Sequence, residues 1–155
     1  MSTLEVKAIQ APTGYDLQMP AGHIVQTVQS TYATQTSSTS SSFVATGLTA
    51  SITPSSTANK ILILYSLPWR NESSSNINQV TSIYRNGTNL LSSFGTGILK
   101  TDSVPIMAMT GSNYLDSPST TSSTTYAIYL NPLSVSAQWC GGNSTATITL
   151  MEVQG

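Results

Sequence analysis

Apolar and polar residues alternate along much of this chain, which is the pattern of β-strands with one buried face. In the segment VATGLTASI, the residues Val44, Thr46, Leu48, Ala50 and Ile52 fall on one face, and small or polar residues lie between them. The segment HIVQTVQSTYAT before it is rich in β-branched residues, which favour strands. The chain from His23 to Ile52 is therefore predicted to be strand, turn and strand.

The run KILILYSLPW, residues 60–69, is apolar at almost every position, which predicts a central strand in the core. Pro68 has no backbone N–H to donate, so we expect the ladder of this strand to stop there or to reach a sheet edge. Asn86-Gly87 lies between two β-prone runs, and both residues tolerate the positive φ of a type I′ turn. This dipeptide predicts a hairpin.

The remaining apolar segments are short and are separated by Gly, Pro, Ser and Thr. Two short strands are expected at about 104–110 and 112–117, and further strands in the segments TTYAIYLNPL, VSAQWC and TATITLMEV. Two Ser/Thr tracts, at 37–42 and 117–125, lie between predicted strands and are interpreted as connections within one domain. No segment of useful length has helical periodicity. We predict an all-β fold, an antiparallel β-sandwich that is jelly-roll-like, in residues 22–155.

Residues 1–21 differ from the rest, because two Pro and two Gly in the twelve residues APTGYDLQMPAG prevent a long helix or a central strand. We interpret this segment as an extended N-terminal arm; a frayed terminus is the alternative. Its apolar residues are too many for a tail that touches nothing, and they are candidate docking residues: Leu4, Val6, Ile9, Tyr15, Leu17 and Met19.

Charged residues are scarce in this chain, and their scarcity restricts the classes of partner that it can bind. Charged residues make up 7%, against about 25% in typical domains, while the sequence contains 26 Ser and 23 Thr. The net charge is −1 and no basic cluster exists, which argues against nucleic-acid binding by phosphate neutralisation. No apolar run is long enough for a membrane span, and the first residues lack the layout of a signal peptide, so we expect synthesis in a cytoplasm and no membrane partner.

Candidate chemistry is sparse. One histidine, His23, and one cysteine, Cys140, cannot by themselves supply a metal site, and the carboxylates are scattered, all but Glu152 in the arm or in predicted loops. We expect no catalytic residues, no metal and no cofactor. Most aromatic residues are expected in the core or in a subunit interface. Tyr126 and Tyr129 fall on opposite faces of one strand, so one of them is expected outside. Trp69 and Arg70 form a candidate exposed contact surface.

A set of motifs in a fixed order resembles small structural proteins of tailed bacteriophages, notably those of aquatic bacteria. The set consists of GHIVQTV, a Ser/Thr tract, FVATGL, SITP and KILIL, and later the hairpin IYRNGT, the segment YLDSPSTTSSTTY and the final TATITLMEV. The resemblance covers about residues 22–153 and leaves the arm outside. It implies a virion component with a β-sandwich fold, often a homotrimer.

Three functional hypotheses follow from the residues and the resemblance. The first is a capsid decoration or cement protein on the outer capsid surface, whose partners are the major capsid protein and further copies of itself, with the arm docked on neighbouring subunits. The second is a fibre tip or receptor-binding module that contacts host-surface glycans. The third, an enzyme such as a surface depolymerase, has no supporting motif.

Overall fold

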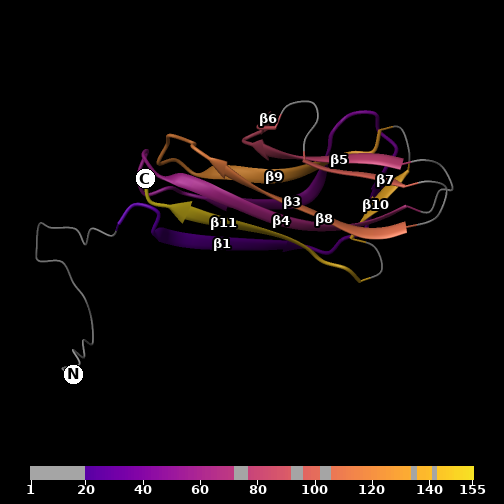
Figure 1. Cartoon of the computed structure of the whole chain (residues 1–155), viewed down its shortest axis with the longest axis horizontal. Coiled ribbons are helices and arrows are strands. Elements are labelled where there is room, and N and C mark those ends of the chain that lie inside the picture. Colours follow the sequence, from indigo (N-terminus) through magenta and orange to yellow (C-terminus); the bar gives the residue numbers. More distant parts are fainter. Residues whose placement is uncertain (1–19, 72–76, 92–95, 102–105, 134–135, 141–142) are drawn as a thin grey trace, which may run out of the picture.

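The structure, a computed structural model, describes residues 20–71, 77–91, 96–101, 106–133, 136–140 and 143–155. The arm residues predicted to dock, Leu4, Val6, Ile9, Tyr15, Leu17 and Met19, lie outside this part of the chain. The described part begins with a turn at Pro20–Gly22, in which the N–H of His23 bonds the carbonyl of Pro20. Gly22 and Gln154 are also hydrogen-bonded, so this turn lies beside the C-terminus (Figure 1).

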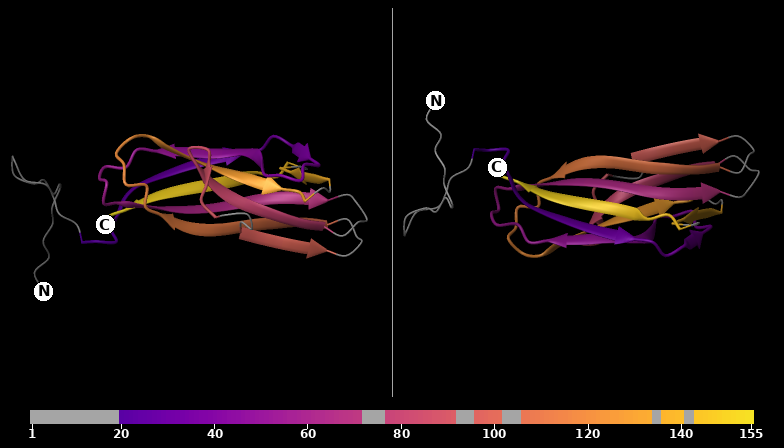
Figure 2. Two further views of the ribbon diagram at one scale, coloured as in Figure 1. Left: turned by 90° about the horizontal axis from the view of Figure 1, so that it is seen from above. Right: turned by 90° about the horizontal axis from the view of Figure 1, so that it is seen from below.

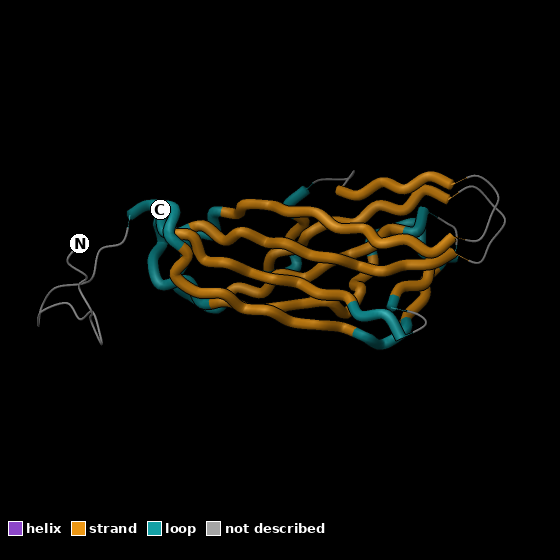
Figure 3. Tube along the Cα trace, turned by 60° about the horizontal axis from the view of Figure 1, so that its bottom comes forward, coloured by secondary structure: helices purple, strands orange, loops and turns teal. Residues whose placement is uncertain are grey.

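The described residues form eleven strands and no helix (Figure 3). The strands are β1 (Ile24–Tyr32), β2 (Thr36–Ser38), β3 (Val44–Ile52), β4 (Lys60–Asn71), β5 (Ile77–Arg85), β6 (Thr88–Asn89), β7 (Thr96–Thr101), β8 (Ile106–Asp116), β9 (Thr124–Asn131), β10 (Ala137–Trp139) and β11 (Ala146–Val153). The prediction of an all-β fold is confirmed.

The strands form two antiparallel sheets that lie face to face (Figures 1 and 2). In sheet A the long strands have the order β1-β11-β4-β8. Beyond the pairing of β11 with β4, the short strand β10 pairs with β4 in place of β11, and β2 pairs with β10. Sheet B has the order β3-β9-β5, and both β6 and β7 pair with β5. The core lies between the sheets, so the molecule is a β-sandwich.

The predicted alternation in β3 is confirmed by its burial. Leu48, Ala50 and Ile52 are buried in the core, and the residues between them are exposed. Thr46 is also buried, and its hydroxyl donates to the carbonyl of Ile128 in β9, which satisfies the polar group. The indole N–H of Trp139, among the largest fully buried side chains, donates to the carbonyl of Thr46. The period-2 pattern therefore fixes which face of sheet B enters the core.

The central strand is β4, as the apolar run predicts, but its ladder does not stop at Pro68. The pairing with β8 continues through Pro68 to Asn71. On its other side, β4 pairs with β11 as far as Ser66 and with β10 from Trp69 onward. The carbonyl of Pro68 accepts the N–H of Cys140 there. Proline thus stands at the junction of two partner strands, where its missing N–H leaves only one bond unmade.

The Asn86-Gly87 hairpin is confirmed. Asn86 and Gly87 have φ of 47° and 83°, and Arg85 pairs with Thr88 across the turn. Both Ser/Thr tracts also lie inside the domain: the first contains the short strand β2, and the second connects β8 to β9.

The two short strands predicted around residues 104–117 are one long strand, β8, with an unbroken register against β4. Thr110 and Gly111 interrupt the apolar pattern there and suggested a break in the strand. A Cβ on Gly111 would lie 2.6 Å from the carbonyl oxygen of Tyr65. Glycine therefore allows the close approach of β8 to β4, and it does not end the strand.

Candidate contact surface

The outer face of sheet A is formed by the side chains that point away from the core. Its rows run across β1, β11, β4 and β8 because the registers of the three ladders align. One row contains Gln29, Thr149, Leu64 and Asn113. Neighbouring rows are similar, with Thr, Ser, Leu and Met as the main residues. This face is a wide sheet surface made of hydroxyl-bearing and apolar side chains.

One side of this face carries an apolar patch, which we define as Leu64, Met107, Met109 and Leu115. Their exposed fractions are 36%, 68%, 63% and 48%. Met107, Met109 and Leu115 all belong to β8, and Leu64 lies on the adjacent strand β4. Met107 and Met109 lie towards one end of β8, and Leu64 and Leu115 lie towards the other, so the apolar patch extends along this strand. Single exposed apolar residues are ordinary, but several along one strand indicate a contact site.

Charge is nearly absent from the same face. Along β1, β11, β4 and β8, the charged side chains that point outward are Lys60 and Arg70, at opposite ends of β4. Some hydroxyl groups between them form hydrogen bonds across strands. The hydroxyl oxygens of Ser66 and Thr147 lie 2.9 Å apart, and the side-chain amide of Gln29 donates to the hydroxyl of Thr149. A partner that covers this face therefore has little charge to desolvate.

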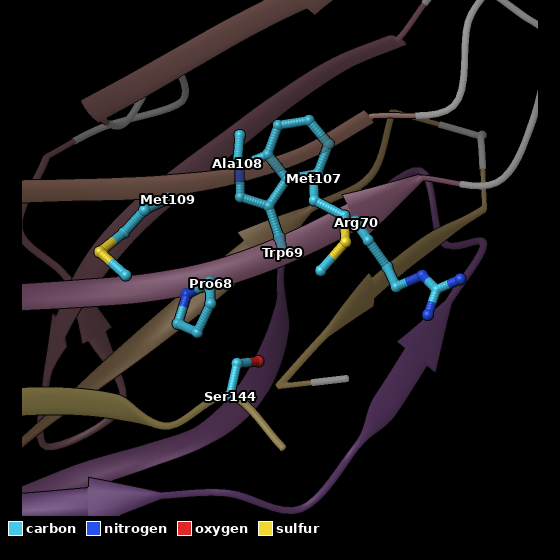
Figure 4. A pocket seen from close by; sticks show the side chains of 7 residues that line it. All are labelled: Pro68, Trp69, Arg70, Met107, Ala108, Met109 and Ser144. Carbon is cyan, nitrogen blue, oxygen red and sulfur yellow. The ribbon is translucent and has the colours of Figure 1, made fainter. Parts of the chain in front are cut away.

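A hollow of about 300 Å³ lies at the end of the face where β10 replaces β11 (Figure 4). Figure 4 shows Met107 and Met109 from β8 and Pro68 and Arg70 from β4 around it, with Ser144 opposite. This volume is at the small end of ligand pockets, which span about 300–1,000 Å³. Because its lining is mostly apolar and continuous with the apolar patch, we treat it as part of the contact face.

The structure separates the predicted pair Trp69 and Arg70. Arg70 is half-buried and lines the hollow on the outer face, as expected of a contact residue. Trp69 is 3% exposed and belongs to the core, so the expectation of an exposed Trp69 is wrong. Successive side chains of a strand point to opposite faces, so only the side chain of Arg70 points outward, although Trp69 also contributes to the lining of the hollow.

The sequence pattern was not interpreted as placing Met107 and Met109 on an exposed face. The signal for them was the alternation IMAM at the start of β8, which places both methionines on one face. The sequence could not show which face was outward.

One described carboxylate, Asp116, joins the two sheets. It was expected in a loop, but it is the last residue of β8 and is buried. Both of its oxygens accept bonds of 2.9 Å from Arg85, and Tyr126 donates its hydroxyl to it at 2.6 Å. Burial raises the pKa of Tyr126, and the hydrogen bond to Asp116 and its negative charge raise it further, so the phenol stays protonated. The arrangement is a structural tie.

Glu152 of β11 is completely buried and is held by uncharged donors. One carboxylate oxygen accepts the backbone N–H and the hydroxyl of Ser55 and the amide of Asn59, and the other accepts the amide of Gln26. Burial by itself would raise the pKa of Glu152, but the hydrogen bonds from Asn59, Gln26 and Ser55 outweigh it and lower the pKa. Glu152 therefore ties β1 and the loop after β3 to β11.

The other candidates for chemistry are isolated. His23 is exposed before the start of β1, whereas Cys140 is buried as predicted. Burial raises the pKa of Cys140, although a backbone hydrogen bond at Ala146 opposes it, so the thiol form is favoured. Among the described residues, no group of three His, Cys, Asp or Glu side chains could hold a metal ion.

Aromatic side chains gather on the outer face of sheet B. Tyr126 is fully buried and Tyr129 is partly exposed, so the prediction that one of the two lies outside is confirmed. Tyr129 stacks on Tyr84, with ring centroids 3.8 Å apart, and Phe43 meets Tyr84 edge-on. We define Phe43, Tyr84 and Tyr129 as the aromatic cluster.

Comparison with known proteins adds no relative: no family model matches this chain, and no curated protein matches it. In the part of the chain that the structure describes, no helix is long and apolar enough to cross a membrane. The function is therefore inferred from the fold and from the outer faces of sheets A and B.

Proposed function

We propose that this chain is a structural protein of a bacteriophage particle, a capsid decoration or cement protein that binds the outer capsid surface and stabilises the shell. It acts by contact and not by catalysis, and its partner is the major capsid protein. It is synthesised in the host cytoplasm and resides on the virion.

The observation that carries this proposal is the outer face of sheet A. It is wide, nearly free of charge, and includes an apolar patch at β8 and a shallow hollow beside it. Such a face can be covered by another protein surface with little desolvation of charge. The two carboxylates that are described, Asp116 and Glu152, are both held in structural hydrogen bonds, which favours a role in contact over one in hydrolysis.

The strand order also supports the proposal. Four strands of the six-stranded sheet A have the order β1-β11-β4-β8, and four strands of the five-stranded sheet B have the order β3-β9-β5-β7. Consecutive strands among these eight lie mostly in opposite sheets. This order supports the proposal of a jelly roll, an architecture that viral capsid domains are among the proteins to use. Lectins and cupins share this architecture, so it agrees with the function without deciding it.

The resemblance of residues 22–153 to phage structural proteins supports a place on the virion, whereas the arm is inferred from the residues of the N-terminal segment alone. Residues 1–21 are proposed to dock on neighbouring capsid subunits through Leu4, Val6, Ile9, Tyr15, Leu17 and Met19. An extended segment of this length reaches about 60–70 Å.

The test is co-sedimentation with purified capsids that lack the protein. We expect Leu64→Lys, in the middle of the outer face of sheet A, to weaken binding at least about tenfold because it buries an unpaired charge. Ala45→Lys, at an exposed position of sheet B, is the matched control and should bind normally. Deletion of residues 1–19 should also remove binding while the unfolding transition is retained. Full occupancy by the Leu64→Lys variant and by the truncated protein would contradict the proposal.

A second candidate function, a fibre tip or receptor-binding module that contacts host glycans, is favoured by the aromatic cluster on sheet B. Partly exposed tyrosines present flat faces to which sugar rings can bind. In a glycan array, specific binding that Tyr129→Ala abolishes, together with no binding to capsids, would replace the first function by the second.

A further inference from the structure

Strand β8 is a long edge of sheet A. It pairs with β4 along its whole length, from Ile106 to Asp116, and none of the described strands pairs with its other side. Strand β7 packs against β8 from sheet B, but it forms no ladder with it. Every second residue of β8 therefore presents an N–H and a C=O that have no partner strand.

The residues whose backbone groups face the free edge can be identified from Pro68. Its carbonyl bonds Cys140 on the β10 side of β4, so it points away from β8. Because bonding direction alternates along antiparallel strands, Met109, the partner of Pro68 on β8, points its own N–H and C=O away from β4. The same holds for every second residue: Met107, Met109, Gly111, Asn113 and Leu115.

Four of these residues also have their side chains on the outer face, Gly111 has none, and all five residues are exposed. The devices that protect natural sheet edges are absent from β8: it has no lysine, no proline and no register shift. Its one charged residue, Asp116, is buried and paired with Arg85. With a net charge of −1, two copies of the chain repel each other little.

We propose that β8 pairs with β8 of a second copy, antiparallel and about a two-fold axis perpendicular to sheet A. The pairing makes one continuous sheet from the two outer faces and closes with two copies. It does not depend on the proposed function, because it is a property of the isolated protein.

The register of this pairing follows from the edge itself. A two-fold axis at Gly111 pairs Met107 with Leu115, Met109 with Asn113 and Gly111 with Gly111 of the second copy. In this register the edge-facing N–H and C=O groups of all five residues form hydrogen bonds. A shift by two residues leaves one edge-facing residue of each copy unpaired, Met107 or Leu115 according to the direction. The axis at Gly111 also brings the apolar patches of the two copies together, since Met107 of each lies beside Leu115 of the other.

The size of the interface sets its expected strength. Eleven strand residues extend about 37 Å, and because stacked sheets are about 10 Å apart, an edge of that length offers on the order of 400 Å² per copy. Stable interfaces bury about 800 Å² per partner, so we expect a concentration-dependent dimer and not an obligate one.

Sedimentation equilibrium of the full chain from about 10 to about 500 µM tests the pairing. We expect the mass to rise from 16.3 kDa towards twice that value, and Met109→Lys to weaken association at least about tenfold. Val25→Lys changes an apolar residue, 42% exposed, on the opposite edge, and should leave association unchanged. A mass of one chain at all concentrations, a trimer, or equal effects of the two variants would overturn the proposal.

Cysteine pairs test the register. In the proposed dimer, Met109→Cys combined with Asn113→Cys brings cysteines within about 5.5 Å between Cα atoms, a separation that a disulfide spans. Met107→Cys combined with Asn113→Cys is the matched control, because it suits a register shifted by two residues. Mild oxidation should give a covalent dimer with the first pair and little with the second. Equal yields from the two pairs, or cross-linking of the control alone, would overturn the register.

Discussion

The two long edges of sheet A, β1 and β8, are built from different residues. Along most of β1 the outward-facing residues, Thr27, Gln29 and Thr31, are polar. The exposed apolar residues Ile24 and Val25 lie at its start, where its register against β11 shifts. β1 also lies against β3, where the ring of Tyr32 covers Gly47. Three of the five outward-facing residues of β8, Met107, Met109 and Leu115, are apolar, and its register is unbroken. A polar, bulged and covered edge resists pairing, whereas an apolar and regular edge invites it.

The two edges are also held to the domain in different ways at the same end of the sandwich. β1 is tied through Gln26 to Glu152, whose partners are all uncharged. β8 is tied through Asp116 to Arg85 and Tyr126 of the other sheet, so an ion pair connects this edge to sheet B. The β8 edge therefore depends on one charged contact, and the β1 edge depends on a network of neutral donors.

The largest effect is expected from Asp116→Ala, which would loosen the β8 edge. The change leaves Tyr126 and the partly buried Arg85 without their acceptor, and we expect a loss of about 3 kcal/mol in the free energy of unfolding, measured in urea. Hydrogen exchange should accelerate in β8 more than in β1. Asp116→Asn keeps an acceptor for Tyr126 and should lose less. Equal acceleration in both edges would remove the distinction between their anchors.

A smaller effect, which depends on pH, is expected from Glu152→Gln at the β1 edge. The pKa of Glu152 is lowered in the folded state, so its stabilising contribution is complete above the unfolded value of about 4.3 and is lost as the pH falls through the folded pKa. Glu152→Gln should cost about 2 kcal/mol at pH 7. It should also flatten the decline in urea stability between neutral and acidic pH. An unchanged slope would mean that other carboxyls cause the decline.

The smallest effect on stability is expected from Met107→Thr combined with Met109→Thr, which gives β8 the residue type of β1. Both methionines are exposed, so the free energy of unfolding should change by no more than about 0.5 kcal/mol. Self-association should weaken but not vanish, because the backbone groups of the edge remain. Association as strong as in the natural chain would show that the side chains do not matter to the pairing.

Much of the fold could be predicted from the sequence because its signals are local. The alternation in β3, the apolar run of β4 and the Asn86-Gly87 turn each depend on a few neighbouring residues, and each is found as predicted. The prediction of two strands in place of β8 was wrong because a glycine between two apolar segments, such as Gly111, is also typical of a turn. Glycine is needed at this position because the backbone of Tyr65 on another strand approaches closely, and no local sequence pattern contains that contact.

The contact surface could be predicted only in part. The sequence placed Arg70 on a surface but also placed its neighbour Trp69 there, because an aromatic residue at the end of a strand suits either face. Asp116 was expected in a loop, and its partners Arg85 and Tyr126 come from different strands of the other sheet. Contacts between residues far apart in the chain have no local signal.

The sequence by itself determined that this protein is built from strands, that it has little charge and that hydroxyls cover much of its surface, because these follow from residue type and period. Only the tertiary structure decided which face is buried in a strand that is apolar on both sides, such as the start of β8, and which strands end the sheets. It also showed that the exposed methionines lie on an edge with which no other described strand pairs. The physical reason is that a strand has two equivalent faces and two equivalent edges until a partner strand and a second sheet cover one of each.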